Sequence, residues 1–148
     1  MSMIEMLARA KADNDPGRLV EAIPYARWLG MEFKAEGANL AAKLRFHEDL
    51  VGNASVPALH GGTVGALLES TAIFEVLWRM ETAVLPKTIT FTVDYLRPAK
   101  LQDVHARATV TRQGRRVANV RAEAWQEDPA RPVATANAIF LVLPSEPK

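Results

Sequence analysis

The sequence predicts an α+β fold, in which an antiparallel sheet of five to six strands wraps around one long central helix. The main observation is the segment from Gly61 to Thr82, which has no proline and carries apolar residues on nearly every face, as buried helices do. Two strand-like segments precede it and four follow it, mostly separated by short turns. Since no other part of the chain is long enough to cover this helix on all sides, we expect the sheet to do so.

Composition limits the classes of protein to which this chain can belong. Its 148 residues are 49% hydrophobic, which fits one globular domain whose core needs no covalent support. The lack of cysteine excludes disulfides, zinc sites built on cysteine and a cysteine nucleophile. The formal net charge of +1 argues against nucleic-acid binding through bulk charge, so a small-molecule substrate or a protein partner is expected.

Targeting segments and metal sites are also predicted to be absent. No apolar run reaches the roughly 18–20 residues of a membrane helix, and Glu5, Arg9 and Lys11 interrupt the first segment, which argues against a signal peptide. The three histidines are well separated and show no metal-ligand spacing. We therefore expect a cytoplasmic protein with no membrane segment, no metal and no other cofactor.

Residues 1–15 are predicted to form an N-terminal amphipathic arm, and residues 16–148 a single domain. Apolar residues recur at helical spacing over 3–10, and the pattern stops at a run of turn-forming residues. A second helical pattern spans 19–26 and includes Pro24 near its end, where proline should end or bend a helix.

Two predicted strands follow, 29–33 and 39–46, and form a hairpin around the turn Glu36-Gly37. In the second strand apolar and polar residues alternate, which is typical of a strand with one buried face. Segment 48–57 contains glycine and proline and is predicted to be a loop that leads into the long helix.

The rest of the chain is predicted to form four more strands. They span 88–96, 103–112, 116–127 and 133–143. Alternation is clearest in the second and third of these strands, and Gln113-Gly114 supplies the turn between them. Prolines interrupt the chain before the last strand, as expected for a connecting loop.

Glu69 is a carboxylate on the long helix with no cation on its own face. Its neighbours at helical spacing are glycine, alanine and aliphatic residues. One interpretation is that this strip faces water, where glutamate is a good helix former. The other is a catalytic carboxylate in a cleft of small residues. Glu75 and Arg79, four residues apart, are interpreted as an ordinary stabilising ion pair.

The run His60-Gly61-Gly62 opens the helix, and two consecutive glycines at this point reduce helix stability. They indicate either that another group comes close to the backbone or that the turn into the helix needs unusual backbone angles. In the first case, free N–H groups at the helix N-terminus can stabilise negative charge that develops on an oxygen atom.

Three stretches of the sequence together resemble one known family. Residues 52–69, with H-G-G at the helix start and an acidic residue eight positions after the first glycine, are similar to the signature of hotdog-fold acyl-CoA thioesterases of the phenylacetic-acid-degradation type. Residues 88–99, which contain Y-L-R-P-A, and residues 24–31 are similar to other parts of that family. The resemblance covers most of the chain beyond the N-terminal arm.

This resemblance implies a homodimer or a dimer of dimers, with active sites between subunits. It assigns polarisation of the thioester carbonyl to the backbone N–H of Gly61. It assigns activation of water, or direct attack, to Glu69 of the opposing subunit. Thr88 matches a position that assists the water, and Asn53 resembles an asparagine that precedes H-G-G in many members.

Further residues are predicted to bind the substrate. His60 and Gly62 open the helix beside it, where His60 is expected to order the loop. For the phosphates of CoA, residues 97–121 contain seven Lys and Arg and one carboxylate. The alternative is a solvated strand face on which charge prevents aggregation. Arg97 and Arg116 are the residues predicted to contact phosphate.

The predicted function is hydrolysis of a medium-chain or aromatic acyl-CoA to the free acid and CoA. The main alternative is a non-catalytic hotdog module that binds acyl-CoA or a protein partner. A hotdog dehydratase or hydratase is disfavoured, because the resemblance implies that such families pair a catalytic histidine with an acid in other motifs.

Overall fold

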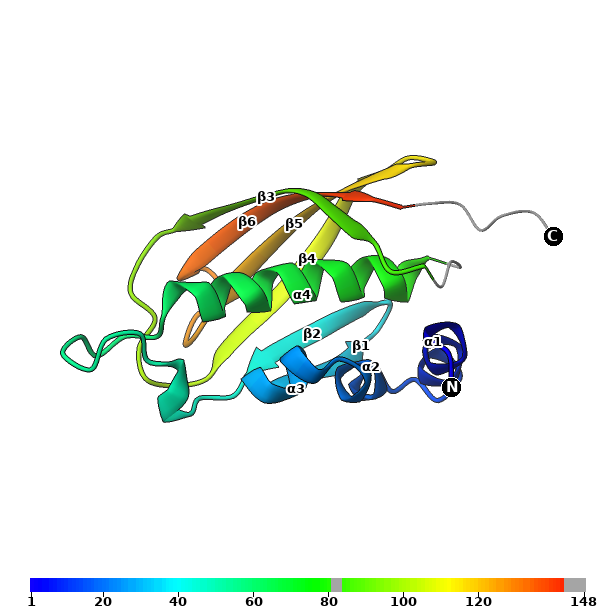
Figure 1. Ribbon diagram of the computed structural model, residues 1–148. Coiled ribbons are helices and arrows are strands. Elements are labelled where there is room, and N and C mark those ends of the chain that lie inside the picture. The colour runs from blue at the N-terminus through cyan, green and yellow to red at the C-terminus, as the bar shows by residue number, and fades with distance from the viewer. Residues whose placement is uncertain (81–83, 143–148) are drawn as a thin grey trace.

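The computed structural model describes residues 1–80 and 84–142 (Figure 1). Its helices are α1 (Met3–Ala12), α2 (Gly17–Ala22), α3 (Pro24–Leu29) and α4 (Gly61–Arg79), with a 3-10 helix at Glu48–Leu50. Its strands are β1 (Met31–Glu36), β2 (Asn39–Leu44), β3 (Lys87–Tyr95), β4 (Val104–Gln113), β5 (Val117–Trp125) and β6 (Ala134–Leu141). The predicted helix end at 81–82 and the last residue of the predicted final strand, Leu143, lie outside the described residues.

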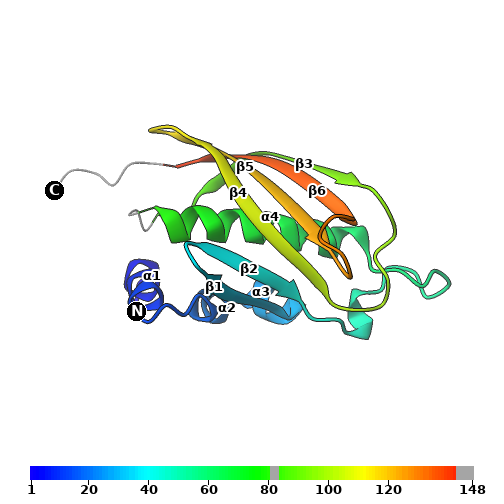
Figure 2. The ribbon, with the colours of Figure 1, turned by 180° about the vertical axis from the view of Figure 1, so that it is seen from behind.

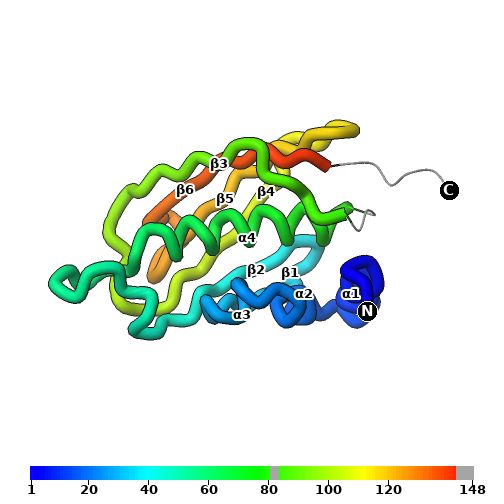
Figure 3. The backbone as a smooth tube through the Cα atoms, viewed as in Figure 1, coloured from blue at the N-terminus to red at the C-terminus, as the bar shows by residue number. Residues whose placement is uncertain are grey.

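The described strands form one sheet with the order β1-β2-β4-β5-β6-β3. All neighbouring strands are antiparallel, and the sheet curves around α4 (Figures 1 and 2). The backbone tube shows α2 and α3 beside β1, at the opposite edge of the sheet from β3 (Figure 3). The predicted class, an antiparallel sheet wrapped around one long helix, is confirmed.

Small side chains on the inner face of the sheet allow it to approach α4 closely. Most of the buried residues on β4, β5 and β6 are alanines: Ala106, Ala108, Ala118, Ala122, Ala124, Ala134, Ala136 and Ala138. The larger side chains of this core come from the helix: Leu67, Leu68, Phe74, Val76 and Leu77. Each fully buried side chain of this size stabilises the fold by about 1.5–3 kcal/mol, so the contact between helix and sheet is a major source of stability.

The predicted break near Pro24 is present, and it divides the helical pattern over 19–26 into two helices. α2 ends at Ala22, Ile23 has extended backbone angles (φ −112°, ψ 102°), and Pro24 begins a separate helix, α3. Proline fits the first turn of a helix because no N–H is needed there, and it disfavours helical angles in the preceding residue. α3 includes Leu29, where the sequence predicts a strand, and Gly30 ends it with φ 78°.

The predicted ion pair of Glu75 and Arg79 is present, but it differs from an ordinary helix pair because Glu75 lies in the core. Its side chain is fully buried, with 0% exposure. Its oxygens accept hydrogen bonds from the Leu40 backbone N–H (2.9 Å) and from Arg79 Nε (2.9 Å). Arg79 also donates to the Asn39 side chain. Since a buried carboxylate needs partners for its charge, these contacts join the C-terminal half of α4 to the start of β2.

The helix α1 contributes to the same core. Leu7 and Ala10 are buried, and the Lys11 side chain donates a hydrogen bond to the carbonyl of Met80, just after α4. The division into an arm over 1–15 and a domain over 16–148 stays a prediction. Within residues 1–80 and 84–142, no helix combines the length and the apolar character needed to cross a membrane.

Candidate active site

The imidazole of His60 caps the N-terminus of α4. Its Nδ1 accepts a hydrogen bond from the Gly62 backbone N–H (2.8 Å), so the ring carries its proton on Nε2 when it makes this bond. The preceding loop is held by two backbone bonds, from His60 N–H to the Leu50 carbonyl (2.8 Å) and from Leu59 N–H to the Ala99 carbonyl (2.9 Å). His60 therefore orders the loop, as the sequence predicts.

The backbone N–H of Gly61 is left without an acceptor in the described part of the chain. Gly61 is the first residue of α4, and the N–H groups of a first helical turn have no partner within the helix. The Gly62 N–H is occupied by His60, so Gly61 supplies the donor that remains open at the N-terminus. The helix dipole makes such a donor favourable for an oxygen that gains negative charge.

The two opening glycines are explained by close contacts. A Cβ at Gly62 would lie 2.8 Å from Nδ1 of His60, and a Cβ at Gly61 would lie 3.3 Å from the ring of Tyr95. Neither glycine has a positive φ; among the described glycines only Gly30 and Gly37 do. Of the two interpretations of these glycines, close approach of another group is therefore correct.

Glu69 and Thr88 are in direct contact. The hydroxyl of Thr88 donates to Oε1 of Glu69 across 2.8 Å, which leaves Oε2 available to a water molecule or a substrate. Glu69 is half-buried, and its helical neighbours Ala66 and Ile73 are also only partly covered. This strip of α4 is open to solvent in the single chain, so a catalytic role for Glu69 stays a prediction.

A β-bulge in β3 turns Thr88 toward Glu69. In the register with β6, Thr88 lies opposite Phe140 and Phe91 lies opposite Ala138, with a shift between Thr88 and Thr90. Phe140 and Ala138 are both buried on the inner face of the sheet. Since residues directly opposite each other share a face, Thr88 and Phe91 both face inward although they are three positions apart. One extra residue in a bulge produces this change of face.

Gly61 and Glu69 lie too far apart in one chain to act on the same carbonyl group. Their positions on α4 differ by eight residues, which corresponds to about 12 Å along the helix axis. Glu69 contacts Thr88 near the start of β3, whereas Gly61 contacts Tyr95 at its end. We call these two separate groups of candidate residues half-sites, with Gly61 in the first and Glu69 and Thr88 in the second.

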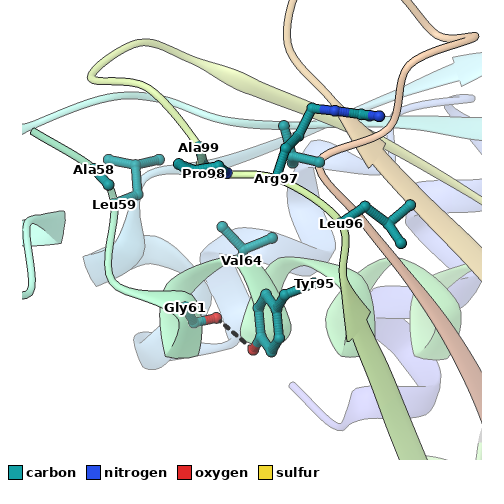
Figure 4. Close-up of a pocket in the computed structure, with 10 residues that line it drawn as sticks. Ala58, Leu59, Gly61, Val64, Tyr95, Leu96, Arg97, Pro98 and Ala99 are labelled. Atoms are coloured by element: carbon teal, nitrogen blue, oxygen red, sulfur yellow. Dashed lines mark hydrogen bonds between the residues drawn. The ribbon is translucent and has the colours of Figure 1, made fainter.

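Arg97 lies near the first half-site, in a hollow of about 390 Å³ beside the N-terminus of α4. Its lining includes Gly61, Val64, Tyr95 and Arg97 (Figure 4). The guanidinium group donates to the carbonyl of Pro132. Of the two predicted phosphate ligands, Arg97 is therefore the one that shares a hollow with Gly61.

Arg116 and Asn53 do not line the hollow beside Gly61. Arg116 lines a separate hollow at the β4–β5 turn, together with Gly114 and Arg115, at the end of the sheet where β3 begins (Figure 1). Asn53 is in the loop that projects beyond the N-terminus of α4 (Figure 1), and its side chain accepts from Ser55 N–H (2.9 Å). Within the described chain, neither residue makes a hydrogen bond with the Gly61 half-site.

Tyr95 is a residue of the site to which the sequence analysis assigns no role. Its hydroxyl donates to the carbonyl of Gly61 across 2.8 Å (Figure 4). It belongs to the Y-L-R-P-A run that supports the resemblance, but nothing in a strand pattern shows that it contacts the helix start. In residues 1–80 and 84–142, no three His, Cys, Asp or Glu side chains are grouped so that they could hold a metal ion.

A long helix inside a curved antiparallel sheet, with an open amide at its N-terminus, defines a hotdog-fold protein, and comparison with known proteins agrees. The model of the thioesterase superfamily matches residues 57–133. The medium/long-chain acyl-CoA thioesterase YigI of Escherichia coli (strain K12) is 32% identical over 136 residues, covering 81% of this chain and 86% of the relative.

Two crystal structures are similar over nearly the whole chain. A protein from Chromobacterium violaceum is 35% identical with a TM-score of 0.78, covering 97% of this chain and 99% of that one. A phenylacetic acid degradation-related protein from Ralstonia eutropha JMP134 is 26% identical with a TM-score of 0.75, covering 93% and 99%. The chain belongs to the thioesterase superfamily. The predicted family and the predicted hydrolase class are thereby confirmed.

Proposed function

We propose that this protein hydrolyses a medium-chain or aromatic acyl-CoA to the free acid and CoA, at sites formed between two subunits. The observation that carries the proposal is the pair of half-sites on α4, an open amide at Gly61 and a carboxylate at Glu69 held by Thr88. An electrophile-stabilising donor and a base for water are the two groups that thioester hydrolysis requires. The acyl groups named are supported by the similarity to YigI and to the Ralstonia eutropha protein.

The proposed reaction assigns one step to each group. The Gly61 N–H donates to the thioester oxygen, and Glu69 takes a proton from water as the water oxygen attacks the carbonyl carbon. The carbon–sulfur bond then breaks, the acid is released, and the CoA sulfur receives the proton held by Glu69. The bond from Thr88 to Oε1 orients the carboxylate, so Oε2 is the oxygen that contacts the water.

The edge strand β3 supports a homodimer that completes the site. β3 is an outer strand of the sheet, and its residues Ile89 and Tyr95 are each 56% exposed. Uncovered edge strands tend to pair with another chain. If two β3 strands pair antiparallel about a twofold axis between Phe91 and Thr92, Thr88 of one subunit lies beside Tyr95 of the other. Glu69 then approaches Gly61 of the second subunit. A dimer of dimers is compatible with this pairing.

Arg97 is proposed to bind a phosphate of CoA, because it shares a hollow with the Gly61 half-site. Arg116 is proposed as a second phosphate contact from the other subunit. It lies at the end of the sheet where β3 begins, which is the end that the proposed pairing brings toward Gly61 of the partner. Asn53 is proposed only to shape the loop at the entrance of the site.

The test is a thiol-release assay on short, medium, long and aromatic acyl-CoAs with the wild type, Glu69→Gln and Glu69→Ala. Loss of a general base should lower kcat by about 10²–10⁴-fold. Glu21→Gln is the matched control, since Glu21 is an exposed helical glutamate on α2, away from both half-sites. Turnover that survives in both Glu69 variants contradicts the assignment of Glu69. No thiol release by the wild type on any substrate contradicts hydrolysis and favours a binding module.

A further inference from the structure

We propose that Tyr95 is a positioning residue, whose hydroxyl holds the first peptide of α4 so that the Gly61 N–H is aimed at the thioester oxygen. This inference rests on the proposed function, in which Gly61 polarises the carbonyl. Tyr95 itself does not contact the reacting atoms. It acts through the backbone of Gly61, to which its hydroxyl donates across 2.8 Å (Figure 4).

Two side chains hold the same peptide group from opposite ends. Tyr95 donates to the carbonyl of Gly61, and His60 accepts from the N–H of Gly62. These two polar atoms belong to one planar peptide unit, so the two bonds together restrict its rotation. The Gly61 N–H belongs to the preceding peptide, which joins this one at the Cα of Gly61. A restraint on the second peptide is needed to orient the first, because glycine has the most conformational freedom of any residue.

Gly65 gives a second, independent observation. It lies in the interior of α4, one turn after Gly61, where alanine is a better helix former. A Cβ at Gly65 would lie 3.2 Å from the Tyr95 hydroxyl, and a Cβ at Gly61 would lie 3.3 Å from a carbon of its ring. Both glycines therefore leave room for one side chain, and the ring of Tyr95 lies along the first turn of the helix.

The direct test is Tyr95→Phe, which removes the hydroxyl and keeps the ring. We expect kcat to fall about 10-fold. This is less than the 10²–10³-fold that follows loss of an oxyanion donor, because the donor remains and only its orientation is disturbed. KM should stay within about twofold, since the hydroxyl does not touch the substrate. If Tyr95 had only a structural role, Tyr95→Phe would lower the free energy of unfolding, and kcat would not fall while KM stayed constant.

Tyr25→Phe is the matched control. Tyr25 is the other of the two tyrosines in the chain, and it is 56% exposed, the same as Tyr95. Its ring stacks on Trp28 with centroids 6.2 Å apart, and its hydroxyl makes no hydrogen bond within the described residues. Its removal should leave kcat and KM unchanged.

Gly65→Ala tests the same hydroxyl from the helix side. The added methyl group should displace the hydroxyl and lower kcat by a similar factor, while the Tm stays equal or rises because alanine favours the helix. In the Tyr95→Phe background there is no hydroxyl to displace, so Gly65→Ala should then have little further effect on kcat. This non-additivity is the signature of a shared contact.

The outcomes separate this inference from the proposed function. If the wild type turns over and Glu69→Gln does not, but Tyr95→Phe keeps the wild-type kcat, the positioning role is overturned and the proposed function stands. If Gly65→Ala lowers kcat equally with and without the hydroxyl, the positioning role is also overturned. If the wild type releases no thiol from any acyl-CoA, the proposed function fails, and the role of Tyr95 fails with it.

Discussion

At several positions of this protein, the residue type is explained by the neighbouring group that the residue contacts. Gly62 leaves room for the ring of His60, and Gly61 leaves room for the ring of Tyr95. Glu75 is buried because a backbone N–H and a guanidinium satisfy its two oxygens. In each case the reason for the residue type lies in a contact that its own position in the sequence does not reveal.

The buried pair of Glu75 and Arg79 gives a prediction about stability. Arg79→Met removes the cation and leaves a buried carboxylate with one partner, so the free energy of unfolding should fall by about 2 kcal/mol. This is below the 3–5 kcal/mol of a fully buried pair, because the Arg79 side chain is 39% exposed and water can replace part of the interaction. Urea denaturation of both proteins measures the difference.

The control for this prediction is Arg18→Met. Arg18 pairs with Asp13 at 2.7 Å, and both side chains are about half exposed. An exposed pair of this kind contributes at most about 1 kcal/mol. Equal losses of stability in the two variants would contradict the prediction, because they would show that the buried pair contributes no more to the free energy of unfolding than the exposed pair.

At the scale of elements, the bulge in β3 determines which threonine reaches Glu69. Thr88→Val should remove the bond to Oε1 and lower kcat by about 10-fold, since the carboxylate loses its orientation. Thr88→Ser should keep most of the activity because the hydroxyl remains. Thr90→Val is the control, as Thr90 lies opposite Ile139 on the outer face.

Kinetic constants of the three variants check this prediction. In a regular strand with no bulge, Thr88 and Thr90 would share one face, and the two valine variants would behave alike. A loss of kcat that is equal in Thr88→Val and Thr90→Val would therefore contradict the position of the bulge.

The elements of this fold could be predicted to within a few residues because their patterns are local. Period-two alternation predicts strands, and an all-round apolar segment predicts the buried helix. The bulge could not be predicted this way. In residues 88–95 the alternation places Ile89, Phe91 and Val93 on one face and Thr88 on the other, and only the register with β6 shows that Thr88 faces inward. Pro24 shows the same limit, since a proline can end one helix or begin another.

Part of the candidate site could be predicted from the sequence. Glu69, Gly61 and Thr88 follow from the resemblance, and the structure shows that Glu69 and Thr88 are bonded. Tyr95 could not be predicted, because its role depends on the crossing of β3 over the start of α4. Their roles in catalysis stay predictions that the variants above test.

At the scale of the whole molecule, a site shared by two subunits predicts complementation between inactive variants. Gly61→Pro removes the proposed donor. Proline is favoured at the first helical position, and His60 already has the extended angles that precede proline (φ −59°, ψ 127°). The added Cβ requires the Tyr95 ring, 3.3 Å away, to shift slightly. Glu69→Gln removes the proposed base. Each variant alone should form inactive dimers.

Co-refolding the two variants at equal amounts should restore activity. Half of the dimers would be mixed, and each mixed dimer has one site with both groups intact, so about one quarter of the wild-type activity is expected. Thiol release before and after co-refolding measures this, and light scattering checks that the species are dimers. If no activity returns although mixed dimers form, each site lies within one subunit.

The alanines that line the inner face of the sheet have a consequence for how substrate preference can change. They bring the sheet against the leucine and phenylalanine side chains of α4, and interiors of this kind are close-packed. A hydrocarbon chain has no room in that layer, so under the proposed function it must lie outside the core, along the face that the two subunits share. Substitutions in the alanine layer should then change the free energy of unfolding. Substitutions along the exposed edge should change the preferred acyl chain length without destabilising the core.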